Sequence, residues 1–133
     1  MVLTGAPVVQ EQQLVADILS NGQFDEKHLV NLTGQLTLKQ LAAIISKARC
    51  FIGVDSVPMH IAAAVKTPTV ALFGPSNAAI WSPWQVSHQV VRSRPSCQPC
   101  MQKGCGNSGW SECMDRISVQ DVTDALSQVD VVG

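Results

Sequence analysis

Residues 51–75, FIGVDSVPMHIAAAVKTPTVALFGP, constrain the fold of this chain more than any other segment. The first four of them form a short apolar run without alternation, which predicts a buried strand. Asp55 and Ser56 then suit a strand-end turn and helix N-cap, and Pro58 suits a first helical turn, where its missing N–H has no partner to lose. The free N–H groups of this turn and the helix dipole together predict an anion site that favours a phosphate.

Composition restricts the class of protein. A chain of 133 residues, 46% of them hydrophobic, is long enough to bury the core of one domain over residues 1–133. The net charge of -1 and the lack of a basic tract argue against nucleic acid as a partner. No apolar run reaches the roughly 18 residues of a membrane span, and the N-terminus lacks the features of a signal peptide. We therefore expect a cytoplasmic protein.

Strand and helix signals alternate along the chain. Strands are expected at residues 2–4, 29–32, 51–54, 69–73 and 88–92, and helices at residues 10–19, 38–47, 58–65 and 119–126. The strands are continuous apolar runs, which is typical of a parallel sheet covered by helices on both faces. Ligands bind at the carboxyl ends of such strands. Four turns are expected on that edge: Thr4-Gly5-Ala6, Thr33-Gly34-Gln35, Asp55-Ser56-Val57 and Phe73-Gly74-Pro75-Ser76.

Each of these signals also has a purely structural interpretation. Asp55 and Ser56 could be ordinary capping residues, which from spacing alone is the more frequent outcome. His60 lies one turn after the cap, where it could donate to an anion, although a histidine without a ligand is commoner. Gly74 suits a plain strand-end turn and a close approach to a ligand equally well. The tryptophans favour packing and loop anchoring over a sugar platform, although the first two follow the Gly74 turn closely enough to line a cleft: Trp81, Trp84 and Trp110.

Four of the five cysteines fall in one expected loop, residues 97–113, at Cys97, Cys100, Cys105 and Cys113. A CxxC pair followed by two more thiols suits tetrahedral zinc better than a disulfide framework in a reducing compartment. The spacing is not a regular pair of CxxC motifs, so free thiols are an equal alternative to a structural zinc ion. Disulfides and an iron–sulfur cluster are less favoured. Cys50 stands alone at the start of an apolar strand and is expected in the core.

The run NLTGQLTLKQLAAIISKARCFIGVDSVPMHIAAAVKTPTVALFGPS, residues 31–76, resembles the nucleotide-sugar-binding domain of the ADP-heptose:lipopolysaccharide heptosyltransferases, glycosyltransferase family 9. The shared pattern is an aspartate followed by Ser or Thr, a histidine, an alanine-rich helix, a Thr-Pro and a Phe-Gly-Pro-Ser. The cysteine-rich stretch CQPCMQKGCGNSGWSECMDRIS, residues 97–118, resembles the same family and most closely its heptosyltransferase III branch.

The resemblance implies an enzyme of the GT-B type, which has two facing Rossmann-like domains, and this chain resembles the C-terminal one. The first strand of that domain is expected to be absent, which would leave an exposed sheet edge that a second copy of the chain could pair with. The catalytic base is expected in the missing N-terminal domain. We therefore expect no catalytic residue in this chain and no activity from the chain alone.

Site residues also follow from the resemblance. Asp55, Ser56 and the backbone of Val57 would lie against the diphosphate and sugar of ADP-heptose. His60 would reach the phosphates, and a phosphate neighbour would favour its charged donor form over a role as base. Many members of the family have glycine where this chain has Val57, so a side chain there would narrow the approach. Four further positions are expected at the ligand, the first against the adenine: Leu36, Gly5, Thr4 and Gly74.

The full enzyme would transfer heptose from ADP-heptose to a hydroxyl of the lipopolysaccharide inner core with inversion. No cofactor is expected for this step, because Asp55 is the only carboxylate in the motif. A lipid-linked acceptor implies work at the inner membrane. The alternative function is a Rossmann-like module that binds a nucleotide, or docks through its cysteine loop, without transferring anything.

Overall fold

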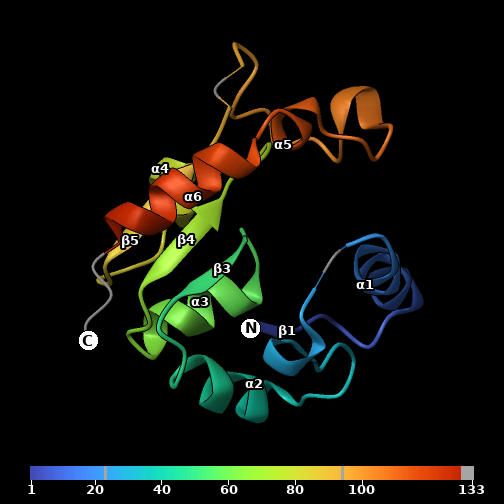
Figure 1. The fold of residues 1–133 in the computed structure, drawn as a ribbon. Helices are drawn as coiled ribbons and strands as arrows, with labels where there is room; N and C mark the ends of the chain where they lie inside the picture. Colours follow the sequence, from blue (N-terminus) through green and yellow to red (C-terminus); the bar gives the residue numbers. More distant parts are fainter. Residues whose placement is uncertain (23, 94, 130–133) are drawn as a thin grey trace. The chain divides into compact units, whose positions relative to one another are not determined.

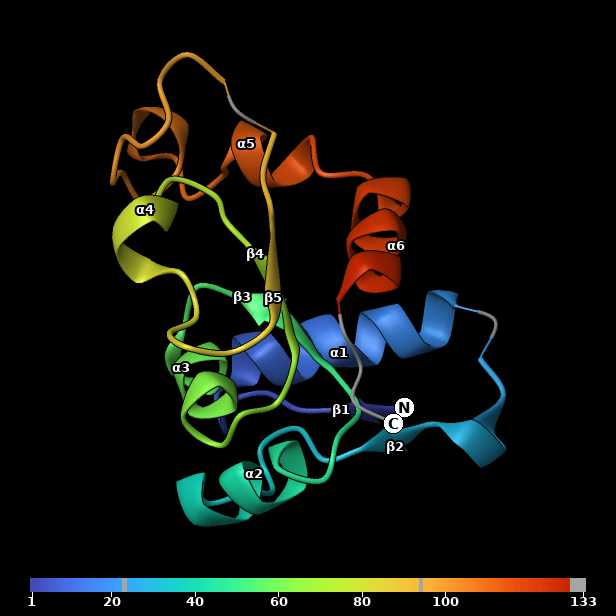
Figure 2. The ribbon, with the colours of Figure 1, turned by 90° about the vertical axis from the view of Figure 1, so that its left-hand side faces the viewer.

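The computed structural model describes residues 1–22, 24–93 and 95–129 (Figures 1 and 2). The chain divides into two compact units, residues 1–41 and 42–133, and each unit is described by itself. The interpretation of residues 1–133 as a single domain stays a prediction. Among the described residues, none of the helices is long and apolar enough to cross a bilayer.

The first unit contains two short parallel strands and one long helix. Strand β1 (Val2–Leu3) pairs in parallel with β2 (Val30–Asn31), and helix α1 (Val9–Asn21) connects them. The 3-10 helix η1 (Glu26–His28) precedes β2. The expected strands and helix are therefore present, with shorter strands and a longer helix. The apolar face of α1 is not in the core, because no residue of this helix is buried.

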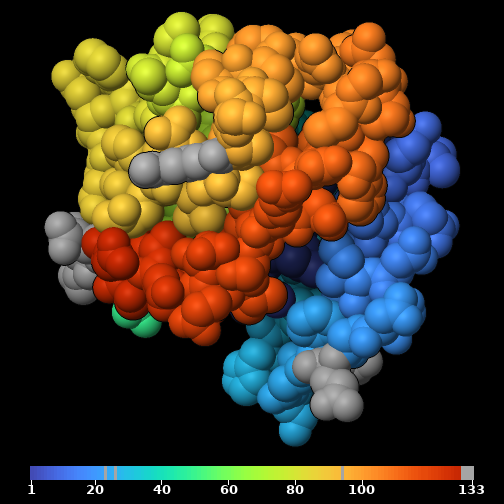
Figure 3. Space-filling model, turned by 90° about the horizontal axis from the view of Figure 1, so that it is seen from above, coloured from blue at the N-terminus to red at the C-terminus, as the bar shows by residue number. Residues whose placement is uncertain are grey.

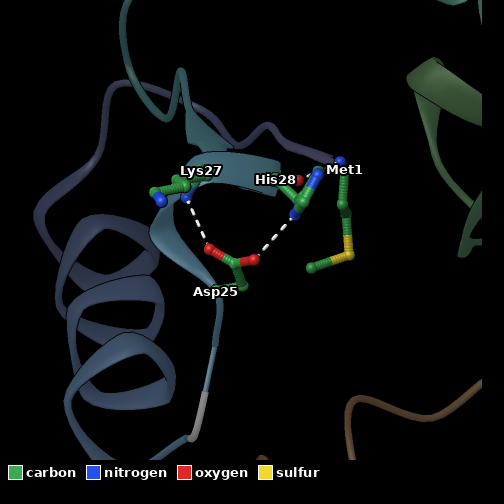
Figure 4. A network of polar contacts seen from close by, with 4 residues as sticks. All are labelled: Met1, Asp25, Lys27 and His28. Carbon is green, nitrogen blue, oxygen red and sulfur yellow. Dashed lines mark hydrogen bonds and ion pairs between the residues drawn. The ribbon is translucent and has the colours of Figure 1, made fainter.

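A polar network fixes the start of this unit (Figure 4). The carboxylate of Asp25 accepts a hydrogen bond from the backbone N–H of Lys27 at 3.0 Å and contacts Nδ1 of His28 at 2.8 Å. The terminal amine of Met1 donates to the carbonyl of His28. These contacts cap η1 and hold the N-terminus beside it, so β1 enters in register with β2.

Two turns meet at the carboxyl ends of β1 and β2. The backbone N–H of Gly34 donates to the carbonyl of Gly5 at 3.0 Å. Gly34 has φ +74, in the left-handed region that favours glycine. A Cβ on Gly5 would lie 2.9 Å from Cγ2 of Thr33, so only glycine lets the turns approach this closely. The sequence therefore placed both turns correctly on one edge.

Replacing Thr33 by valine is expected to stabilise the chain by about 1 kcal/mol. Thr33 is 8% exposed, and its Oγ1 has no hydrogen-bond partner among the described residues. Valine has a similar shape and removes the buried, unpaired hydroxyl. Urea unfolding measures the difference. Thr33→Ser keeps the hydroxyl and loses the methyl group, so it should be less stable than the wild type; a loss of stability in Thr33→Val would contradict this account.

The second unit is built around a three-stranded parallel sheet. Helix α2 (Leu38–Ile45) spans the boundary between the units. The strands are β3 (Phe51–Val54), β4 (Thr69–Leu72) and β5 (His88–Val91), in the order β3-β4-β5. Helix α3 (Val57–Ala64) connects β3 to β4, and the short α4 (Ala78–Trp81) lies between β4 and β5. Two more helices follow β5, α5 (Glu112–Asp115) and α6 (Val119–Gln128).

Side chains in and just after β4 alternate between two core clusters, so this central strand is covered on both faces. Ala71 and Phe73 pack with residues of α3 and α4, namely Met59 and Ala78. Val70 packs on the opposite side with three residues from β5 and the α6 region: Val91, Ala125 and Val129. Figure 3 shows α6, in red, next to the yellow to orange segment that includes β5, and the two elements are in contact. The parallel α/β fold class is confirmed.

The inward face of α6 differs from the expected one. Val122 packs against the core as expected, but Leu126 is exposed and Ala125 is buried in its place. At 3.6 residues per turn, positions 125 and 126 lie equally far on either side of the face that Val122 and Val129 define. The spacing along the sequence therefore did not distinguish Ala125 from Leu126.

The strands form two separate ladders among the described residues, β1-β2 and β3-β4-β5, where one continuous sheet was expected. Within this part of the chain β3 pairs only with β4, so its other edge is open. Ile52 and Val54 of β3 are about half exposed. These two side chains share one face of the strand, so β3 has an exposed apolar face next to its unpaired edge. The missing neighbouring strand and pairing with a second copy of the chain stay predictions.

Candidate functional site

The turn between β3 and α3 presents backbone donors without acceptors. Ser56 is the N-cap residue of α3, as expected, and Pro58 lies in the first turn. Its side chain makes no capping hydrogen bond, contrary to expectation, because the Ser56 hydroxyl donates to the preceding carbonyl of Val54 at 3.2 Å. No acceptor among the described residues meets the N–H groups of Ser56 and Val57. These donors lie at the positive end of the helix dipole, where an anion is favoured.

Asp55 and His60 form a pair beside these donors. Their closest atoms, Oδ1 of Asp55 and Nε2 of His60, lie 3.7 Å apart, and the side chains are 20% and 46% exposed. The backbone N–H of Asp55 donates to the carbonyl of Leu72, which ties the turn to the end of β4. The structure thus brings together Asp55, Ser56, Val57 and His60.

Gly74 has a packing role that the sequence left open. A Cβ at this position would lie 2.7 Å from Cγ of Met114, so glycine lets α5, at the end of the cysteine loop, pack against the end of β4. Gln98 donates from Nε2 to the carbonyl of Phe73 at 3.1 Å and also to that of Gly74. The strand-end interpretation therefore has direct support, and contact between Gly74 and a ligand stays a prediction.

The other predicted site residues belong to the first unit. Thr4 and Gly5 follow β1, and Leu36 lies between β2 and α2. All three are half buried. Hence the predicted site residues fall in two groups, one in each unit, and their roles at a ligand stay predictions.

The cysteine loop contains more regular structure than expected. It contains the 3-10 helix η2 (Cys105–Asn107) and helix α5, which the sequence analysis missed. All five cysteines are free thiols, and Cys50 is half buried against the core as expected. Among the described residues, no three His, Cys, Asp or Glu side chains converge as metal ligands. A structural zinc ion at the four loop cysteines, like its free-thiol alternative, therefore stays a prediction.

Cys113 is expected to react more slowly with iodoacetamide at neutral pH than Cys97 or Cys105. Burial raises the pKa of the Cys113 thiol, with smaller contributions in the same direction from Cys105 and Cys100. Cys97 and Cys105 are exposed. A pKa that is higher by one lowers the fraction of reactive thiolate at neutral pH about tenfold. Cys113 should therefore be labelled as fast as Cys97 and Cys105 only at alkaline pH. Peptide mass spectrometry measures the rates; equal rates in the folded chain would contradict this, and equal rates in denaturant are the control.

Trp81 contacts His60 at this site, which the sequence did not predict. Its indole ring meets the ring of His60 edge-on, with centroids 6.3 Å apart and an angle of 69° between planes. Trp81, Trp84 and Trp110 are all exposed, so none of them is a core residue, and their expected role in anchoring loops stays a prediction. The only sequence signal was that Trp81 follows the Gly74 turn closely, because residues 60 and 81 are far apart along the chain.

A parallel α/β unit with an anion-ready helix N-terminus at a strand end is the architecture of a nucleotide-binding protein. The family model described as glycosyltransferase family 9 (heptosyltransferase) matches residues 1–111. The chain therefore belongs to glycosyltransferase family 9.

Individual relatives agree with this family. Lipopolysaccharide heptosyltransferase 3 of Escherichia coli is 42% identical over 84 residues, which are 63% of this chain and 24% of that protein. Lipooligosaccharide heptosyltransferase 2 of Campylobacter jejuni (serotype O:6) is 33% identical over 120 residues, 90% of this chain and 38% of that protein. The structure of E. coli ADP-heptose lps heptosyltransferase II matches with a TM-score of 0.74 and 26% identity, over 95% of this chain and 34% of that one. The chain thus spans well under half the length of the relatives it matches.

Proposed function

We propose that this chain is the ADP-heptose-binding part of a lipopolysaccharide core heptosyltransferase, and that it holds the donor diphosphate at the N-terminus of α3. The observation that carries this proposal is the pair of free N–H groups of Ser56 and Val57 next to the Asp55–His60 pair. Backbone N–H groups and an imidazole N–H suit the charge and the oxygen atoms of a diphosphate. Membership of family 9 supports the choice of nucleotide sugar.

In the proposed reaction, an acceptor hydroxyl on the inner core attacks the anomeric carbon of the heptose. The bond from that carbon to the diphosphate oxygen breaks, and ADP leaves with inversion at carbon. Negative charge grows on the departing oxygen, where the N–H groups of Ser56 and Val57 and the imidazole of His60 would stabilise it. Asp55 would orient His60. The base that takes the hydroxyl proton is proposed to lie outside these residues, because Asp55 is the only carboxylate in the segment 51–75.

For the first unit we propose contacts with the nucleoside. Leu36 would pack against adenine, and Thr4 and Gly5 would lie near the same nucleoside. The relative in E. coli named lipopolysaccharide heptosyltransferase 3 supports lipopolysaccharide as the acceptor, and we propose that the accepting hydroxyl belongs to a heptose of the inner core. Because such an acceptor is lipid-linked, we propose that the full enzyme works on the cytoplasmic surface of the inner membrane.

The proposed step uses no metal or other cofactor. A structural zinc at the cysteine loop is a separate proposal with its own measurement, which is metal analysis of freshly purified chain prepared without reductant. One zinc per chain that is lost on unfolding would establish that ion and overturn the free-thiol state. Its absence would leave the donor site unaffected, since none of the four cysteines belongs to it.

Calorimetric titration of this chain with ADP-heptose and with ADP tests the proposed function. We expect both to bind, and we expect UDP-glucose, with a different base and sugar, to bind more weakly. Asp55→Ala should weaken binding, whereas Asp115→Ala should not, because Asp115 is an exposed aspartate of α5 outside the proposed site. No binding of either ADP compound would refute the proposal. Heptose transfer by this chain alone would refute the absence of the base.

A further inference from the structure

Trp81 occupies a fixed place although its side chain is 47% exposed. It is the last residue of α4, whose first residue, Ala78, is buried in the same cluster as Met59 of α3. The side chain of Asn77 caps α4 by accepting a hydrogen bond from the N–H of Ala79 at 3.0 Å. Core packing therefore holds α3 and α4 together, and it carries Trp81 to His60, the residue after Met59.

The contact between Trp81 and His60 does not contribute to the core. Ala78 is the member of α4 in the buried cluster, and Trp81 is not part of it. His60 is held by two neighbours, with the Asp55 carboxylate 3.7 Å from Nε2 and the Trp81 ring edge-on at 6.3 Å between centroids. An imidazole that is nearly half exposed and lacked such neighbours would rotate freely, and binding an anion would then require ordering it.

We propose that Trp81 is a positioning residue that holds the His60 imidazole in the orientation in which it donates to the diphosphate. This inference rests on the proposed function and adds a residue to it. Because Nε2 faces Asp55, Nδ1 is the ring nitrogen left to donate to the ligand. An aromatic contact of this geometry corresponds to a change in affinity of roughly two- to tenfold.

Trp84 is a matched control from the same stretch of chain. It is 75% exposed, lies three residues after Trp81, and makes no aromatic contact among the described residues. Trp84→Leu removes as much aromatic surface as Trp81→Leu but leaves His60 in place. A difference between these two variants therefore isolates the contact with His60.

The test is a double-mutant cycle for ADP binding, measured by calorimetry on this chain. We expect Trp81→Leu to weaken binding by about fivefold, Trp81→Phe to restore most of it, and Trp84→Leu to change nothing. In a His60→Ala background, Trp81→Leu should have no further effect, since it has no imidazole to position. An equal loss in that background would show that Trp81 acts on the ligand directly and would overturn the proposal, as would no loss in the single variant.

A second measurement examines the contact without any ligand. The ring protons of His60 should show a ring-current shift in the NMR spectrum that Trp81→Leu removes and Trp84→Leu retains. Thermal unfolding of each variant checks that the fold is intact. If the wild type binds no ADP, the proposed function and this inference both fall. If His60→Ala weakens binding and Trp81→Leu does not, only this inference falls.

Discussion

Phe73→Ala is expected to lower the free energy of unfolding by about 3–5 kcal/mol, the largest stability effect of any single change considered for this chain. Phe73 is 0% exposed and shares its cluster with Met59, Ala71 and Ala78. Its backbone N–H donates to the carbonyl of Val91, so the residue is fixed at the end of β4 and the site cannot collapse to fill the cavity. The core that Phe73 fills also sets the spacing between α3 and α4.

Urea unfolding followed by circular dichroism measures this loss. Phe24→Ala is the matched control, since Phe24 is 39% exposed and should lose much less. If Phe73→Ala and Phe24→Ala both lowered the free energy of unfolding by a similar, small amount, the described core would be contradicted. Because domains of this size are stable by only about 5–15 kcal/mol, Phe73→Ala should also leave a measurable unfolded fraction at growth temperature.

His60→Ala is expected to weaken ADP binding by about 10- to 100-fold. Hydrogen bonds to charged groups contribute roughly 1.5–3 kcal/mol each, and an anion at the start of α3 would lose one charge-assisted donor. His60→Gln keeps a neutral donor and should show an intermediate loss. Because the interaction is electrostatic and partly exposed, the difference between wild type and His60→Ala should shrink as salt concentration rises.

His28→Ala is the control for this change. His28 also pairs with an aspartate, Asp25, at 2.8 Å, but it ends a 3-10 helix and has no free helix N-terminus beside it. Its loss should leave ADP affinity unchanged. Equal effects of the two histidine variants, measured by calorimetry, would show that His60 has no special place in binding.

The segment 51–75 was the most predictable part of the fold. Continuous apolar runs marked β3 and β4, and Asp55 with Pro58 fixed the start of α3 to within a residue, because these signals are local. Local signals did not predict the hydrogen bond of the Ser56 hydroxyl. It was expected to cap α3, but it donates to the Val54 carbonyl instead. The sequence also did not predict the short helices α4 and α5, since four residues are too few to show a helical periodicity.

The candidate site was predictable only in its local part. Asp55, Ser56 and His60 lie within six consecutive residues at the start of α3, so their proximity followed from the local sequence. The contact of Trp81 with His60 depends on the packing of Ala78 against Met59, which spacing does not reveal. Similarly, four cysteines in one loop suggested a metal centre, yet the positions of their thiols depend on how the loop packs against Gly74.

An NMR titration of ADP into the uniformly ¹⁵N-labelled chain tests the central claim most directly, because it reports on the individual amides of the proposed site. Helix α6 provides an internal control: a capping box occupies two of its N-terminal N–H groups, those of Ser118 and Asp121, and places the Asp121 carboxylate there, which disfavours an anion. The account predicts saturable shifts of the Ser56 and Val57 amide signals and none of comparable size at the start of α6. Unchanged Ser56 and Val57 signals at saturating ADP, or equal shifts at α6, would contradict it.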